Sequence, residues 1–229
     1  MFNRKPSRVL TSDTHGPYPI SIDGKKFWTS LACKDTGRIF IATTFLKSET
    51  AGEIQFRLQS LANSAGDCVE LRHDSTRDYC KVSNYLRTKG IEEVKTGPYS
   101  SAENGHAERN GRTINTKARC LLIASGIPIQ FWTYAVEHAA WLFNRTPRLR
   151  DGKWTCPIAE FEDNGNYFIE LKDNLPVFGQ LGYVFIPKEK RQSSFSPVSN
   201  ECVLLGFYHS HELVYDFATG SVKEGRSNL

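Results

Sequence analysis

The order of the predicted secondary-structure elements constrains the fold of this chain more than any other feature. Three runs rich in aromatic and β-branched residues come first, with the turn Asp35-Thr36-Gly37 between the second and the third. Helical periodicity then alternates with two further strand-like runs. Three leading strands predict an antiparallel meander, and the helical crossovers predict strands added in parallel beside it. We therefore expect an α/β fold, a mixed five-stranded sheet with flanking helices.

The strands are expected at residues 8–12, 27–32, 39–45, 69–72 and 91–94. One helix is predicted to begin after Ser48, which can cap its first turn, and a second at residues 79–87, closed by Gly90. Two longer helices follow. The first carries an apolar stripe at Ile114, Ala118, Leu121 and Leu122, and the second begins near Pro128 and ends before Pro147.

The pattern changes after Pro147. A charged stretch is followed by short strands near residues 184–186, 202–208 and 213–217, with a turn at 218–220. We expect three parts: a core at residues 1–150, a linker at 151–175 and a small β domain at 176–229.

Charge and cysteine usage limit the classes of function. Residues 166–229 hold 6 Lys and Arg against 7 Asp and Glu, whereas the remaining residues hold 23 against 18, so the basic excess that a polyanion-binding domain needs lies in the larger part. Six irregularly spaced cysteines predict reduced thiols in an intracellular protein, in the nucleus or a cytoplasmic particle. Cys202, His209 and His211 fit no standard zinc site, so no zinc is expected. The sequence has no apolar run of about 18 residues and its N-terminus does not resemble a secretory leader, so we expect no membrane partner.

Three acidic residues stand where such a fold could bring them together. Asp13 and Asp74 come at the ends of predicted strands, and Glu108 lies in the predicted first turn of a helix. Three converging carboxylates can hold two divalent ions about 4 Å apart, and Mg²⁺ or Mn²⁺ suits such oxygen ligands. Spacing alone does not single them out, because the chain has 25 acidic residues. The competing candidates, which fit turns or the surface better, are Asp23, Asp35 and Asp78.

The motifs around these acids form a series. The run from Gly97 to Thr113 holds a Pro-Tyr turn, then Asn-Gly-x-Ala-Glu-Arg, then a basic helix. Residues 12–17 hold Asp13 at the end of a predicted strand, followed by Gly-Pro, and residues 69–74 are a strand that ends in Asp74. Residues 131–147 end in Asn-Arg-x-Pro, and residues 177–207 hold further blocks. Over about residues 8–225 this series resembles the integrase of copia-type LTR retrotransposon polyproteins, with its catalytic core and the C-terminal region often described as SH3-like.

By this resemblance, the chain is the core and C-terminal portion of an integrase, with an RNase H-like fold and a small SH3-like domain. Asp13, Asp74 and Glu108 carry over as the family's Asp-Asp-Glu triad, which is both catalytic and metal-binding. The implied activity is metal-dependent processing of DNA 3′ ends and strand transfer into a target. The implied partners are element and target DNA and further copies of the chain, because integrases of this kind act as multimers.

Residues near Glu108 are candidates for contacts with DNA phosphates, which would make binding salt-sensitive. They are Tyr99, Asn104, Arg109, Arg112, Lys117 and Arg119, with Arg145, Arg148 and Arg150 extending the basic surface. A solvated helix face is the simpler explanation for any one of the basic residues, and Tyr99 and Asn104 could instead shape the turn.

The chain also departs from the family pattern. Residues 75–79 are Ser-Thr-Arg-Asp-Tyr where the family has Asn-Gly-Gly-Glu-Phe, and the 33 residues between Asp74 and Glu108 make a shorter gap than is usual. A misplacement of about 1 Å can reduce a rate about a hundredfold. Two alternatives therefore stay open, a catalytically decayed nucleic-acid-binding remnant and a protein-interaction module that uses the small β domain.

Overall fold

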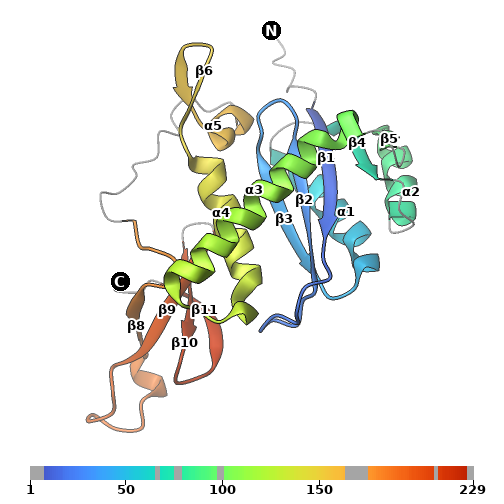
Figure 1. Cartoon of the computed structure of the whole chain (residues 1–229). Helices are drawn as coiled ribbons and strands as arrows, with labels where there is room; N and C mark the ends of the chain where they lie inside the picture. The colour runs from blue at the N-terminus through green and yellow to red at the C-terminus, as the bar shows by residue number, and fades with distance from the viewer. Residues whose placement is uncertain are drawn as a thin grey trace.

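The computed structural model of the chain describes residues 8–64, 68–74, 79–96, 101–162, 175–208 and 211–225. At its centre lies a five-stranded sheet in the order β3-β2-β1-β4-β5 (Figure 1). Its strands are β1 (Arg8–His15), β2 (Phe27–Cys33), β3 (Ile39–Thr44), β4 (Cys68–Asp74) and β5 (Glu92–Thr96). The pairs β1–β2 and β2–β3 are antiparallel, whereas β1–β4 and β4–β5 are parallel. The predicted mixed α/β sheet is confirmed.

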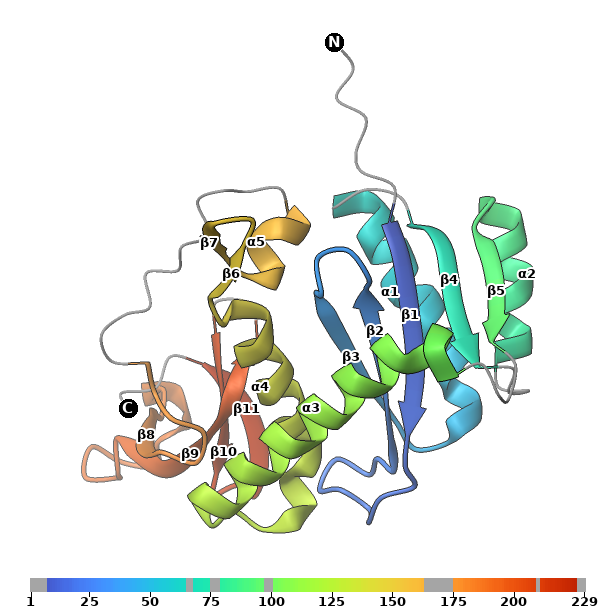
Figure 2. The same ribbon diagram turned by 45° about the horizontal axis from the view of Figure 1, so that its top comes forward.

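Helices cover both faces of this sheet, as Figures 1 and 2 show. One face is covered by α1 (Thr50–Ser64) and α2 (Cys80–Lys89), and the other by α3 (Ser101–Ser125) and α4 (Trp132–Arg145). Leu10 and Leu71 pack on the α1–α2 side, while Trp28 and Ala32 pack on the α3–α4 side. This division follows from the strands, where successive side chains point to opposite faces.

The helix ends agree with the sequence at one place and differ at another. Gly90 ends α2 with a φ of 66°, the left-handed conformation that glycine adopts without strain. The prediction that Ser48 caps α1 is wrong, because a 3₁₀ turn, η1 (Lys47–Glu49), precedes that helix. The Glu49 carboxylate accepts hydrogen bonds from the backbone N–H groups of Phe45 and Leu46, at 3.1 and 3.2 Å. These two donors precede η1, so Glu49 caps the start of the 3₁₀ turn and does not take the place of the expected Ser48 cap on α1.

A second, all-β sheet forms the C-terminal part and is antiparallel throughout, in the order β11-β10-β9-β8. Its strands are β8 (Leu181–Phe185), β9 (Ser199–Tyr208), β10 (His211–Asp216) and β11 (Ser221–Gly225). Val203 and Leu205 of β9, with Phe178, join the apolar cluster that contains Trp28 and Ala135. The small β part thus shares a core with the α3–α4 layer (Figure 2).

Along the chain, two short elements separate the two sheets. They are the hairpin of β6 (Arg148–Arg150) and β7 (Lys153–Thr155) and the short helix α5 (Pro157–Glu162). Phe161 of α5 is buried in the α1–α2 cluster, so the first part of the expected linker packs on the core. The domain boundaries at residues 150 and 176 stay predictions. No helix in the described ranges is long and apolar enough to cross a membrane.

Candidate functional site

Asp13 and Asp74 lie at the same level on neighbouring strands. In the parallel pair of β1 and β4, Thr11 is opposite Arg72, and the two acids come two residues further along each strand. Leu10 and Leu71 point to the α1–α2 side, so alternation directs both acids to the face that α3 crosses. Two of the three predicted acids are therefore brought together by strand pairing alone.

Glu108 approaches this face from α3. Ala107, Gly111 and Ile114 form the buried side of the helix, and Glu108 lies beside Ala107 with an exposed side chain. The predicted position in the first helical turn is wrong, because α3 begins at Ser101, two turns earlier. Since the field of a helix end falls off within about one turn, the dipole of α3 does not offset the charge of Glu108.

The three acids influence one another through their charges. Burial raises the pKa of Asp13, and the negative charges of Asp74 and Glu108 raise it further. His15 and the backbone N–H of Thr14 act in the opposite direction, lowering the pKa of Asp13 without cancelling the rise. The rise therefore comes mainly from burial, to which the charges of the two neighbouring acids add, and a divalent cation beside Asp13 would favour its ionised form.

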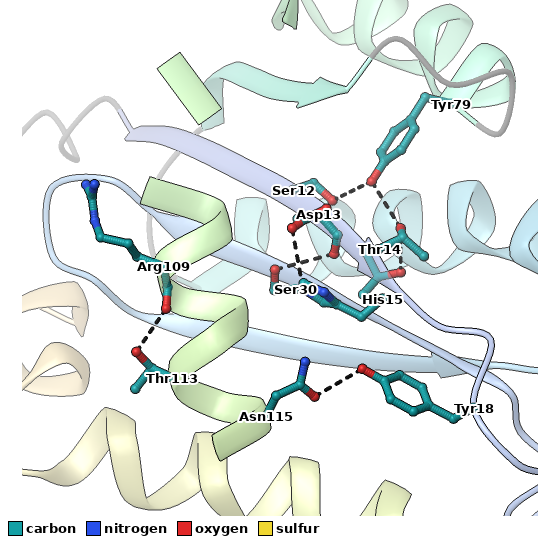
Figure 3. Close-up of polar contacts among 11 residues, drawn as sticks. Ser12, Asp13, Thr14, His15, Tyr18, Ser30, Tyr79, Arg109, Thr113 and Asn115 are labelled. Carbon is teal, nitrogen blue, oxygen red and sulfur yellow. Dashed lines mark hydrogen bonds and ion pairs between the residues drawn. The ribbon is translucent and has the colours of Figure 1, made fainter. Parts of the chain in front are cut away.

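His15 is a member of this site that the sequence analysis missed. It is two residues after Asp13 in β1, so both side chains lie on the same face, and its Nε2 is 3.5 Å from Asp13 Oδ2 (Figure 3). The imidazole stacks on Trp28 with ring centroids 4.2 Å apart, and burial lowers the pKa of His15. The spacing of two along a predicted strand was the signal that could have identified this residue.

A hydroxyl network supports the site from the opposite face of the sheet. The Tyr79 hydroxyl lies 2.9 Å from Ser12 Oγ and 3.3 Å from Thr14 Oγ1, the two residues that flank Asp13 (Figure 3). Its ring stacks on the buried His73 at 4.2 Å, and burial raises the pKa of Tyr79 to about 12. His73 is fully buried, and its Nε2 lies 3.0 Å from Glu93 Oε1.

The carboxylates of Asp13, Asp74 and Glu108 are chemically suitable ligands for a hard divalent cation, but they do not surround a common point at bonding distance. Carboxylate oxygens are the ligands that Mg²⁺ and Mn²⁺ prefer, and such an ion would favour the ionised form of Asp13, which burial and the two neighbouring acids disfavour. Among the residues that the structure describes, however, no three His, Cys, Asp or Glu side chains gather at metal-ligand distances. Asp13, Asp74 and Glu108 therefore do not form a three-ligand set at bonding distance in this structure.

The candidate DNA contacts on α3 lie on its outer surface. Arg109, Arg112 and Arg119 are exposed and Lys117 is half-buried. Figure 3 places Arg109 on the turn of α3 that crosses β1. Tyr99 lies outside the described residues, and so does the side chain of Asn104.

The expected extension of this surface by Arg148 and Arg150 is wrong. Arg148 Nη2 and Arg150 Nη1 pair with the Glu160 carboxylate, and both donate to backbone carbonyls of the β2–β3 turn. That turn lies beside Val9, at the opposite end of β1 from Asp13. These two arginines therefore fix the β6–β7 hairpin and α5 to the core. Arg145, the third residue of the expected extension, stacks on the Trp141 ring.

Similarity to curated proteins covers most of the chain. No protein-family model matches it. It is 28% identical over 206 residues to the retrovirus-related Pol polyprotein from transposon TNT 1-94 of Nicotiana tabacum, which covers 87% of this chain and 15% of that protein. It is 28% identical over 210 residues to that from transposon RE1 of Arabidopsis thaliana, covering 88% and 13%. The chain thus spans only 13–15% of the length of these relatives.

Solved structures share the fold. The catalytic core of BIV integrase matches 70% of this chain with a TM-score of 0.52 at 14% identity and 97% coverage of that core. The HTLV-2 integrase core, solved with magnesium in a trimeric form, matches 69% with a TM-score of 0.50 at 13% identity and 97% coverage. A chain of the simian T-cell lymphotropic virus intasome matches 100% of this chain and 80% of its own length, with a TM-score of 0.55 at 13% identity.

The chain is therefore similar in sequence to retrovirus-related Pol polyproteins of plant transposons, and its α/β part has the fold of a retroviral integrase catalytic core.

Proposed function

We propose that the chain is the catalytic portion of a retrotransposon integrase that joins DNA 3′ ends to a target duplex with the help of divalent metal ions. The observation that carries this proposal is the placement of Asp13 and Asp74 level with each other on the face that α3 crosses, with Glu108 near enough to raise the pKa of Asp13. The relatives are retrovirus-related Pol polyproteins, and one structural neighbour was solved with magnesium.

In this proposal each acid has a separate position. Asp13 and Asp74 offer oxygens from neighbouring strands of a rigid sheet, and Glu108 adds one from a helix. Bound divalent ions would activate the attacking hydroxyl and stabilise the leaving oxygen of the phosphodiester. Arg109 and Arg112, which are exposed and about one turn apart on α3, would hold the phosphate backbone near the acids.

A strand-transfer assay tests this function directly. A labelled duplex with a free 3′-hydroxyl and a plasmid target are incubated with the chain in Mg²⁺ or Mn²⁺. Glu108→Gln should lower the joined product by at least about a hundredfold, because an amide replaces the carboxylate and the negative charge that holds the metal ion is lost. Glu189→Gln, the same change at an exposed acid of the C-terminal part, should leave it unchanged. Equal product from the wild type and Glu108→Gln would remove the enzymatic claim.

A second function is favoured by one observation, the absence among the described residues of three metal ligands at bonding distance. A remnant that binds nucleic acid without catalysis would keep the basic surface of α3 and need no ion. Such binding should weaken steeply between 50 and 200 mM salt, roughly in proportion to the number of phosphate contacts, and should persist in Glu108→Gln. Product in the strand-transfer assay excludes this alternative.

We also propose that more than one copy acts on the two DNA ends. The HTLV-2 core was solved as a trimer, and the full-length match is to a chain of an intasome. Light scattering on the chain with and without duplex DNA measures the stoichiometry, and a mass of one copy in both states would contradict this proposal.

A further inference from the structure

The ring nitrogen of His15 that faces the acids has an unusual environment. Nε2 is buried and has no hydrogen-bond partner among the described residues, although it lies 3.5 Å from Asp13 Oδ2. This distance is longer than a good N–H···O hydrogen bond, which is about 2.7–3.2 Å. A buried polar atom without a partner destabilises the fold unless another group satisfies it.

Two contacts fix the orientation of the imidazole. Trp28, its cross-strand neighbour in β2, stacks on one face of the ring at 4.2 Å with an interplanar angle of 28°. α3 presents Gly111 to the Nε2–Cε1 edge of the ring, where a methyl group would lie 2.3 Å from Nε2 and 2.4 Å from Cε1. The ring is therefore pre-organised, with Nε2 next to the Asp13 carboxylate, and it does not have to be ordered when a ligand binds.

The separation of the two atoms matches that of two ligands of one ion. Ligand atoms about 2.1 Å from a shared metal lie about 3.0–3.4 Å apart for angles between right and tetrahedral. Nε2 and Oδ2, at 3.5 Å, differ from this range by about a tenth of an ångström. An ion between them would use the lone pair of Nε2 that no protein group satisfies.

We infer that His15 is a nitrogen ligand of the ion held by Asp13, so that the site selects Mn²⁺ over Mg²⁺. This inference rests on the proposed function and adds a fourth donor to it. Imidazole is a ligand of transition-metal ions, whereas Mg²⁺ prefers an all-oxygen shell and gives up its waters reluctantly. An all-carboxylate site would bind the two ions with less discrimination.

Pulsed electron paramagnetic resonance of bound Mn²⁺ tests the ligand directly, because a coordinated imidazole gives a ¹⁴N coupling. The coupling should be present in the wild type, change in protein labelled with ¹⁵N-histidine, and vanish in His15→Gln. Titrations should show that His15→Gln weakens Mn²⁺ binding at least about tenfold and Mg²⁺ binding less than about twofold. His211→Gln, the same change at an exposed histidine of β10, should alter neither.

The outcomes separate this inference from the proposed function. Mn²⁺ that binds in an Asp13-dependent way without ¹⁴N coupling, or a His15→Gln variant that loses both ions equally, overturns His15 as a ligand and leaves the metal-dependent function standing. Ion binding that is unchanged in Asp13→Asn overturns both. If His15→Gln does not fold, the labelled wild type still shows whether a histidine is a ligand of the ion, and the absence of any ¹⁴N coupling overturns His15 as that ligand.

Discussion

Gly111 determines how closely α3 can approach β1. A methyl group at this position would lie 2.3 Å from His15 Nε2 and 2.4 Å from Cε1, closer than real contacts allow. His15 cannot move aside easily, since its ring is stacked on the fully buried Trp28. One glycine inside a helix thus keeps Glu108, one turn earlier, near the strand that carries Asp13.

Gly111→Ala should therefore destabilise the fold by about 1–3 kcal/mol through overpacking, which outweighs the gain of up to about 1 kcal/mol in helix propensity. Urea unfolding of the variant measures this loss. Adding His15→Ala removes the clash, so the second change should cost less in the Gly111→Ala background than in the wild type.

Gly52→Ala is the matched control, because Gly52 also lies in a helix and has nothing within 4 Å of an added methyl group. It should stabilise the chain by about 0.5–1 kcal/mol. If Gly111→Ala stabilises it as much as Gly52→Ala does, the close approach of α3 to His15 is refuted.

At the scale of elements, Asn144 ties the end of α4 to an edge of the sheet. Its side chain accepts a hydrogen bond from the backbone N–H of Ile39 at 2.8 Å and donates one to the Ile39 carbonyl at 2.7 Å. The amide thus pairs with β3 as another strand would, and it is buried. This gives a structural reason for the asparagine in the Asn-Arg-x-Pro motif.

Asn144→Asp should cost about 2–3 kcal/mol of the free energy of unfolding, because a carboxylate loses the donor and opposes the Ile39 carbonyl. Chemical denaturation at neutral pH measures the loss. Asn84→Asp, on the exposed surface of α2, should change stability by less than about 0.5 kcal/mol. A loss at Asn144 as small as that at Asn84 would show that α4 does not depend on this pairing.

At the scale of the whole molecule, His138 lies where the C-terminal sheet meets the α/β part. Its ring packs between Trp141, Phe178 and Phe207, and Gly206 of β9 approaches its Nδ1. Burial lowers the pKa of His138 to about 4. The neutral ring thus belongs to a shared apolar core, and a proton on it would place a charge there.

This shift predicts how stability depends on pH. Since the folded pKa of His138 is about 4 and an unfolded histidine titrates near 6.5, the unfolded chain binds the additional proton between these values. The contribution is complete above about pH 6.5 and is lost as the pH falls towards 4. Between pH 7 and 4.5 the wild type should lose about 2–3 kcal/mol more than His138→Phe does.

Urea unfolding at the two pH values measures the difference, and His211→Phe, at an exposed histidine, should keep the wild-type dependence. Identical pH profiles for the wild type and His138→Phe would mean that His138 is not held neutral at this junction.

The sequence by itself determined the order of the elements, the mixed sheet and the placement of Asp13 and Asp74 on two of its strands, because each depends on local periodicity. Residues 13 and 74 follow apolar runs whose parallel pairing could be foreseen. Only the tertiary structure decided how far α3 extends upstream of Glu108, that His15 faces Asp13 beneath Gly111, and that Arg148 and Arg150 anchor a hairpin away from the acids. Each of these depends on which surfaces meet across the sheet, and the packing of side chains distant in the chain is not encoded in local patterns.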